Sequence, residues 1–178
     1  IMKGDPETGY TDYATATFSG SAAPMGSMSY DGKYIIICGW GSSNDYEIFK
    51  HDESAGTYTK LSTTYPKLGS DAPNKPIMIS RSGNYDFALT GSESNGTLTL
   101  KLYKHTAGTD TWTGQSDIVN PTNKPTTNQD YGRFGASFTR DGNYLFLGSY
   151  GSYGGYSMYT IDWDANTAVF SGANRSAG

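Results

Sequence analysis

The fold is decided by SFTRDGNYLFLG at residues 137–148, the clearest of three copies of one pattern. The other copies are MSYDGKYIII at residues 28–37 and ISRSGNYDFA at residues 79–88. In each copy a short run of strand-forming residues meets a turn of the type Asp/Ser-Gly-Lys/Asn, and a Tyr then begins a second, mostly apolar run. Glycine supplies the positive φ that a tight turn needs. The pattern therefore predicts one β-hairpin that is repeated three times.

The spacing of the turn glycines sets the size of the repeat. Gly32 and Gly83 are 51 residues apart, and Gly83 and Gly142 are 59 residues apart. After each hairpin the sequence offers a third and a fourth strand, near residues 45–51 and 57–61, 97–105 and 111–113, and 156–163 and 168–172. Four strands at this period are typical of β-propeller blades. Since no stretch has a sustained helical period, we predict an all-β, β-propeller-like fold of about three four-stranded antiparallel blades.

These units divide the chain into four segments. Residues 1–23 are expected to hold the last strand of a preceding blade, at Tyr13–Gly20, followed by blade 1 at 24–74, blade 2 with a linker at 75–130, and blade 3 at 131–178. Three blades do not close a ring, because propellers have four to eight. Open sheet edges tend to associate. We therefore expect an oligomer or a part of a longer chain, with protein subunits of an assembly as partners.

Composition excludes some classes of partner. The 178 residues carry a net charge of -4 and only 17% charged residues, which argues against a nucleic-acid-binding face. No apolar run approaches the roughly 18 residues of a membrane helix, so we expect no membrane insertion. The 23 glycines and 15 tyrosines suit short strands with many turns and favour an extracellular or virion location. The single Cys38 follows an apolar strand and is expected to be a buried, inert thiol.

Unit three contains YGRFGASF at residues 131–138, followed by DGNYLFLG at 141–148. This sequence resembles the FG-GAP repeat of integrin-type β-propellers. WD-like propellers are a second resemblance, and only unit three has the Phe-Gly pair. FG-GAP blades often hold calcium in a loop with spaced aspartates, as this cation takes six to eight oxygen ligands. The corresponding loops here offer no three spaced carboxylates, so we expect no metal and no cofactor.

No set of residues in the sequence indicates catalysis. His51 and His105 occupy the same place in consecutive units, so they are expected to lie a blade apart and not to converge on one substrate atom. The chain has no nucleophile elbow and no phosphate-binding loop. Paired acids such as Asp52 and Glu53 lie in or beside turns, where solvated carboxylates are ordinary. The sequence alone therefore predicts a protein that is not an enzyme.

Aromatic residues in or beside glycine-rich loops are the candidate binding residues. They are Trp40, Tyr46, Tyr150, Tyr153 and Tyr156. Exposed Tyr and Trp give large, rigid contact areas, although packing between blades is an alternative role for each of them. We predict a non-enzymatic recognition or structural module of an extracellular or virion surface protein, such as a phage fibre, a decoration protein or a bacterial adhesin, that binds a neighbouring subunit or a cell-surface glycan. The alternative is a propeller that gates, or binds substrate for, a larger secreted enzyme.

The hairpins also predict a core. Ile36, Phe87 and Phe146 each follow the turn glycine by four residues. We expect these three side chains to be buried, together with the tyrosines two residues earlier on the same strand face, which are Tyr34, Tyr85 and Tyr144.

Overall fold

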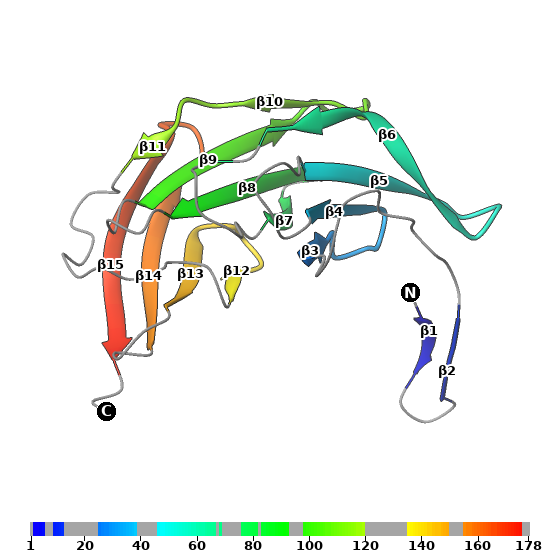
Figure 1. The fold of residues 1–178 in the computed structure, drawn as a ribbon, viewed down its shortest axis with the longest axis horizontal. Coiled ribbons are helices and arrows are strands. Elements are labelled where there is room, and N and C mark those ends of the chain that lie inside the picture. Colours follow the sequence, from blue (N-terminus) through cyan, green and yellow to red (C-terminus); the bar gives the residue numbers. More distant parts are fainter. Residues whose placement is uncertain are drawn as a thin grey trace.

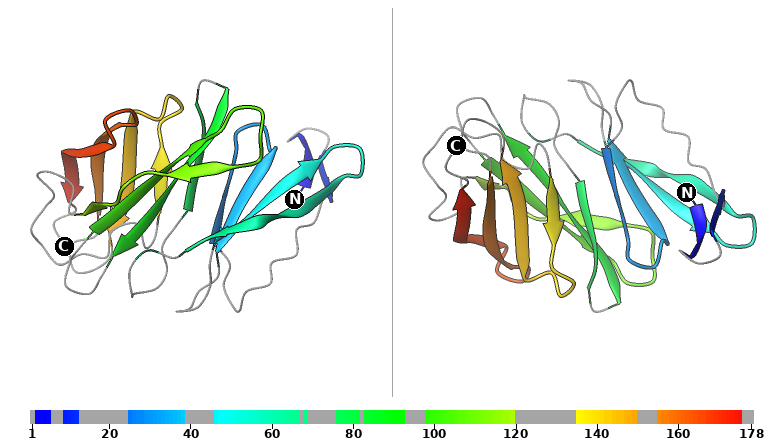
Figure 2. Two further views of the ribbon diagram at one scale, coloured as in Figure 1. Left: turned by 90° about the horizontal axis from the view of Figure 1, so that it is seen from above. Right: turned by 90° about the horizontal axis from the view of Figure 1, so that it is seen from below.

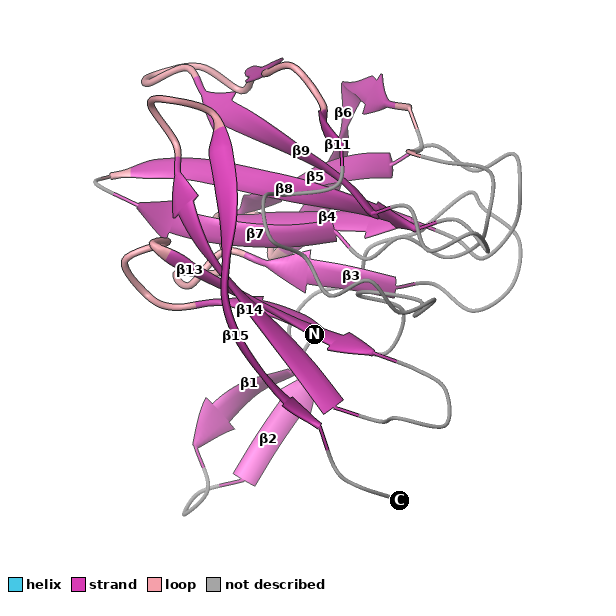
Figure 3. Ribbon diagram, turned by 90° about the vertical axis from the view of Figure 1, so that its left-hand side faces the viewer, coloured by secondary structure: helices cyan, strands magenta, loops and turns pink. Residues whose placement is uncertain are grey.

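A computed structural model describes residues 2–5, 9–12, 25–38, 46–66, 68, 76–81, 83–92, 98–119, 135–149 and 155–175. These residues form strands and the turns between them, and no helix is present among them (Figure 3). A helix that is long and apolar enough to cross a membrane is accordingly not found in this part of the chain.

Three antiparallel sheets account for most of the structure. Blade 1 consists of β3 (Met25–Met28), β4 (Tyr34–Cys38), β5 (Tyr46–Asp52) and β6 (Thr57–Tyr65). Blade 2 consists of β7 (Pro76–Arg81), β8 (Asn84–Ser92), β9 (Leu98–His105) and β10 (Trp112–Gly114), and β11 (Ile118–Val119) also pairs with β9. Blade 3 consists of β12 (Ala136–Phe138), β13 (Tyr144–Ser149), β14 (Gly155–Asp162) and β15 (Thr167–Arg175). A separate hairpin of β1 (Met2–Asp5) and β2 (Gly9–Asp12) precedes them.

The three blades lie side by side as an open fan (Figure 1). In each blade the chain starts at the innermost strand and moves outward, so β3, β7 and β12 gather at the centre of the fan and β6, β10 and β15 lie at its periphery. Views from above and below show the successive sheets facing one another (Figure 2). The prediction of a β-propeller-like fold with three four-stranded blades is confirmed. The strand expected at Tyr13–Gly20 lies outside the described residues.

Apolar side chains fill the two spaces between the blades. The interface of blades 1 and 2 is formed by Tyr34, Ile36, Cys38, Tyr46, Ile48, Tyr65, Leu68, Met78, Phe87, Leu89, Tyr103 and Trp112. The interface of blades 2 and 3 is formed by Ile77, Ile79, Ala88, Leu98, Leu100, Leu102, Leu145, Leu147, Tyr159, Ile161, Trp163 and Ala168. Blade 2 is therefore covered on both faces. Cys38 is buried in the first interface, as predicted.

The predicted core is correct for Tyr34 and Ile36 of blade 1 and for Phe87 of blade 2, but Tyr85 is only partly buried and the prediction is wrong for blade 3. Ile36 and Phe87 are both 0% exposed, and they enter the same interface from opposite sides. In blade 3 the buried residues are Leu145 and Leu147, whereas Phe146 is only partly buried. The tyrosine before it, Tyr144, is 40% exposed. Side chains alternate between the faces of a strand, so Leu145 and Leu147 meet blade 2 while Phe146 points to the opposite side.

The difference between blades starts in the hairpin turns. In blade 1 the Ser29 N–H donates to the Tyr34 carbonyl at 2.9 Å, which leaves four residues in the turn. Blade 3 repeats this bond between Thr139 and Tyr144 at 2.9 Å. In blade 2 Arg81 pairs directly with Asn84, which leaves only two residues between them. Equivalent residues still pair in the same way, since Ser27 lies opposite Ile36 and Met78 lies opposite Phe87. The faces are nevertheless reversed, because Phe87 packs toward blade 1 whereas Ile36 packs toward blade 2.

Candidate ligand site on the propeller axis

The innermost strands of the three blades line a pocket at the centre of the fan. Its volume is about 530 Å³, which is within the ordinary range of small-molecule sites. The residues around it are Ser27, Met28, Tyr30, Ile77, Met78, Ile79, Ser80, Ala136, Ser137, Phe138, Thr139 and Arg140. They belong to β3, β7, β12 and the turns that follow β3 and β12. The pocket is therefore on the axis of the propeller, where a closed ring has its central channel.

Two serine hydroxyls join the innermost strands of blades 1 and 2. The Met78 N–H donates to Ser27 Oγ at 2.9 Å, and the Tyr30 N–H donates to Ser80 Oγ at 3.3 Å. An innermost strand has no neighbour in its own sheet on the axial side, so its outward N–H groups need partners elsewhere. The serines supply these partners, and small polar side chains consequently line the axial pocket.

Arg140 and Tyr30 meet across the pocket from the turns of blades 3 and 1. Both residues lie two positions before a turn glycine, in Tyr30-Asp31-Gly32 and Arg140-Asp141-Gly142. The guanidinium carbon of Arg140 lies 5.1 Å from the centroid of the Tyr30 ring, a distance at which a cation and an aromatic ring attract each other. In the part of the chain that the structure describes, Arg140 forms no ion pair with a carboxylate. Its guanidinium donors are thus available to an anionic or hydroxyl-rich ligand.

The turns that carry these two residues are fixed by the aspartates that follow them. Asp31 Oδ1 accepts hydrogen bonds from Ser29 Oγ at 2.8 Å and from the Lys33 N–H at 3.0 Å. Asp141 Oδ1 accepts from Thr139 Oγ1 at 2.6 Å and from the Asn143 N–H at 3.1 Å. Aspartate in a turn is favoured for this reason. The hydrogen bonds hold the pKa of the Asp141 carboxyl below its usual value, so the turn is built around an ionised carboxylate.

A second polar cluster ties the outer part of blade 1 to blade 2. Tyr34 Oη donates to Asp110 at 2.6 Å, Lys50 Nζ lies 2.8 Å from the same carboxylate, and Tyr85 Oη donates to Asp31 at 2.7 Å. The hydrogen bond to Asp31, together with burial, raises the pKa of Tyr85 to about 12. Burial and the contact with Asp110 raise the pKa of Tyr34 as well. These tyrosines stay protonated at neutral pH and join blade 1 to blade 2 through their hydrogen bonds.

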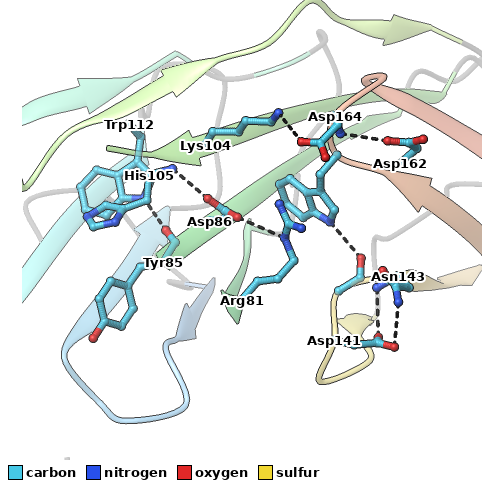
Figure 4. Close-up of polar contacts among 12 residues, drawn as sticks. Arg81, Tyr85, Asp86, Lys104, His105, Trp112, Asp141, Asn143, Asp162 and Asp164 are labelled. Carbon is cyan, nitrogen blue, oxygen red and sulfur yellow. Dashed lines mark hydrogen bonds and ion pairs between the residues drawn. The ribbon is translucent and has the colours of Figure 1, made fainter. Parts of the chain in front are cut away.

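Blades 2 and 3 are joined by contacts around Arg81 (Figure 4). Its Nε lies 3.3 Å from Asp86 Oδ2, and its guanidinium carbon lies 5.2 Å from the Trp163 ring centroid. Asp86 is buried, and its other oxygen accepts the His105 N–H at 2.8 Å. Arg81 is therefore occupied by a structural ion pair, in contrast to Arg140.

The binding residues expected from the sequence do not form this site. Tyr46 is 1% exposed and packs in the interface of blades 1 and 2, so the prediction that it contacts a partner is corrected. Tyr156 is 45% exposed, on the face of blade 3 that points away from blade 2. Trp40, Tyr150 and Tyr153 lie outside the described residues. Sequence reasoning missed Tyr30 and Arg140, whose shared place in two repeats was the available signal.

The lining suits binding better than proton transfer. It offers serine and threonine hydroxyls, the aromatic rings of Tyr30 and Phe138, several Met and Ile side chains and one cation. Among the described residues that surround it there is no carboxylate, imidazole or thiol. Over the ranges that the structure describes, no group of three or more His, Cys, Asp or Glu side chains is placed to hold a metal ion. This part of the chain can therefore orient a polar ligand through hydrogen bonds and charge.

Comparison with known proteins supports the fold. No family model matches the chain, and no curated protein sequence matches it. Among solved structures, a putative 6-phosphogluconolactonase from Bacteroides uniformis ATCC 8492 aligns with 89% of this chain at 15% identity and a TM-score of 0.61. An endo-1,4-beta-xylanase from Bacteroides thetaiotaomicron VPI-5482 aligns with 85% of it at 11% identity and a TM-score of 0.51. This chain spans 46% and 60% of the lengths of those two chains.

These comparisons correct one expectation. The prediction that the chain is not an enzyme is wrong, because the solved structures that share its fold carry the names of enzymes, a lactonase and a xylanase. The prediction was based on the absence of a catalytic motif from the sequence. Blades are short strands joined by turns, and a site on the propeller axis takes single residues from several blades, so no local motif accompanies it.

Proposed function

We propose that this chain is the substrate-binding part of a propeller in a secreted carbohydrate-acting enzyme, and that the axial pocket holds a sugar derivative with an acidic group. The observation that carries the proposal is the guanidinium of Arg140, which lies over Tyr30 at the pocket with no carboxylate partner among the described residues. An Arg fork matches a carboxylate or phosphate group, and hydroxyl side chains match the hydroxyls of a sugar.

The enzyme names of the structural neighbours support the carbohydrate class, since both the lactonase and the xylanase are named for sugar-derived substrates. The low content of charged residues and the high content of Gly and Tyr favour a location outside the cell. The lining of the pocket supports a binding role for this part of the chain, with proton-transfer groups supplied by other parts of the enzyme.

The proposal is tested by titrating the protein calorimetrically with 6-phosphogluconate, gluconate and xylotriose. Binding of the phosphorylated sugar acid is expected, and Arg140→Gln should weaken it by about 10- to 100-fold, since a hydrogen bond to a charged group contributes roughly 1.5–3 kcal/mol. The matched control is Lys101→Gln, which removes the same charge from a residue that pairs with Asp117 at 2.7 Å and does not line the pocket.

Tyr30→Ala should also weaken binding, because it removes the ring that positions the guanidinium. Absence of binding for all three compounds would contradict the proposal. Equal weakening by Arg140→Gln and by Lys101→Gln would contradict it too, because the effect would then reflect net charge and not the axial site.

A further inference from the structure

Blades 1 and 3 present equivalent side chains on one face, which we call the leading face. In blade 1 the leading face consists of Tyr34, Ile36, Tyr46 and Ile48, and it packs against blade 2. In blade 3 it consists of Tyr144, Phe146, Tyr156 and Met158. Strand pairing fixes the correspondence, since Ile36 lies opposite Ile48 and Phe146 lies opposite Met158.

The two leading faces differ in what covers them. The four residues of blade 1 are at most 1% exposed, because Phe87, Leu89 and Trp112 of blade 2 lie on them. In blade 3, Tyr156 is 45% exposed and Tyr144 is 40% exposed, and Phe146 and Met158 are only partly buried. The ring centroids of Phe146 and Tyr156 lie 6.0 Å apart, so two incompletely buried aromatic side chains adjoin on this face. Such a surface marks a site of contact with another protein element.

Polar groups at the edges of the two faces repeat the same difference. Ser27 and Ser137 are equivalent, because they lie opposite Ile36 and Phe146. Ser27 Oγ accepts the Met78 N–H of the next blade at 2.9 Å. Ser137 Oγ donates to the carbonyl of its neighbour Phe138 at 3.3 Å, and no described residue of another blade donates to it.

The turn aspartates behave in the same way. Asp31 Oδ2 accepts the hydroxyl of Tyr85 in the next blade at 2.7 Å. The equivalent oxygen of Asp141 is exposed and accepts Asn143 Nδ2 from its own turn at 2.9 Å. Blade 3 thus carries the two polar acceptors with which blade 1 holds blade 2, and the described residues place no following blade against them.

We propose that the leading face of blade 3 is the docking surface for a fourth four-stranded blade of the same propeller, supplied in the same polypeptide. That blade presents a backbone N–H of its innermost strand to Ser137, a side-chain donor to Asp141, and apolar or aromatic side chains to Phe146 and Tyr156. The contacts of blade 2 with blade 1 are the template for each of these features.

The occupant is assigned to the same polypeptide for two reasons. On the side of blade 1 away from blade 2, Phe49 and Glu47 are already 1% and 7% exposed, so the centre of that face is not open to blade 3 of a second copy. In addition, this chain covers only 46% of the first structural neighbour, so more than half of that single chain lies outside the alignment. The inference does not depend on which ligand occupies the axial pocket.

Thiol labelling of the native polypeptide tests the docking surface. Tyr156→Cys is compared with Val119→Cys, which lies on β11 and is 56% exposed. If a fourth blade covers the leading face, a maleimide should modify the first variant at least about 100-fold more slowly than the second, since labelling of a buried thiol requires local opening. Met158→Cys provides a smaller change on the same face, should Tyr156→Cys fail to fold. The native Cys38 is buried and serves as an internal reference for slow labelling.

The dependence of the labelling rate on protein concentration distinguishes the possible occupants of the leading face. Slow labelling that persists on dilution of a monomeric polypeptide supports a fourth blade in the same chain. Slow labelling that becomes fast on dilution shows that a second copy covers the face, and labelling as fast as that of Val119→Cys shows that nothing covers it. Either of these last two results overturns the proposal. The labelling experiment does not involve the axial pocket, so its outcome and the outcome of the ligand titrations are independent of each other.

Discussion

The first hairpins of blades 1 and 2 have similar sequences and opposite orientations. Both have a turn glycine with positive φ, +75° at Gly32 and +79° at Gly83, and both place a tyrosine within two residues of it. In blade 1 an additional turn residue, Lys33, separates the glycine from the first paired residue, whereas in blade 2 Asn84 is paired at once. The tyrosine and the apolar residue after it therefore face forward in blade 1 and backward in blade 2, where they meet each other. The change from a four-residue turn to a two-residue turn thus accompanies the reversal of the face that each strand presents.

Among the changes considered, deletion of Lys33 should lower the stability of the folded protein most. The shortened turn would move Tyr34, Ile36 and Cys38 to the other face of β4, and a buried side chain of this kind contributes roughly 1.5–3 kcal/mol. Their combined loss approaches the whole stability of a typical domain, about 5–15 kcal/mol, so the deletion variant should fail to fold. Urea unfolding followed by near-ultraviolet circular dichroism measures the effect.

The control for the deletion is Lys33→Ala, which keeps the length of the turn. It removes the contacts of the ammonium with the rings of Tyr34 and Tyr85, 5.5 and 5.0 Å from their centroids, and its attraction to Asp110, and should cost about 1 kcal/mol. A deletion variant with the parental unfolding midpoint would show that turn length does not set the register of β4.

An intermediate effect is expected from alanine at the turn glycines of blades 2 and 3. Gly83 has a φ of +79° and no atom within 4 Å of an added Cβ, so Gly83→Ala should cost only the left-handed strain, about 1–2 kcal/mol. Gly142 has a φ of +76°, and its Cβ would lie 2.9 Å from Ile79 and 3.0 Å from Arg81. Gly142→Ala should therefore destabilise the protein more, by about 2–4 kcal/mol, since overpacking adds to the strain.

Thermal unfolding of the two glycine variants under identical conditions gives the comparison. Equal destabilisation would mean that the turn of blade 3 is not packed against blade 2, contrary to the close approach of the Ile79 and Arg81 side chains to Gly142.

The smallest expected effect concerns pH and the contact between Tyr85 and Asp31. The pKa of Tyr85 is raised to about 12 by its hydrogen bond to Asp31 and by burial, and an unfolded tyrosine titrates near 10. The contact therefore stabilises the fold fully below pH 10 and is lost as the pH rises toward 12. Tyr85→Phe should lower stability at neutral pH, and its difference from the parent should shrink between pH 10 and 12.

Asp31→Asn provides the matched variant, because it removes the acceptor and leaves the tyrosine in place. Urea midpoints at pH 8, 10 and 11 should show the same shrinking difference for both substitutions. A difference that stays constant up to pH 11 would show that the hydrogen bond between the blades does not control the titration of Tyr85.

Much of the fold could be predicted because its signals are local. Each Asp/Ser-Gly-Lys/Asn turn and each alternating strand specifies its own hairpin, so the sequence determined the all-β class, the absence of helical periodicity and the number of blades. The burial of Cys38 and Ile36 also followed from apolar strands of this kind.

Only the tertiary structure decided which of these side chains are core and which are surface. Tyr46 and Tyr156 occupy equivalent positions, yet one is 1% and the other 45% exposed, because blade 2 lies on the first and no described blade lies on the second. Tyr30 and Arg140 are 110 residues apart in the sequence and meet because the innermost strands of successive blades gather at one axis. Burial and convergence depend on contacts between sheets, and a pattern read along a single strand contains no information about the sheet that will face it.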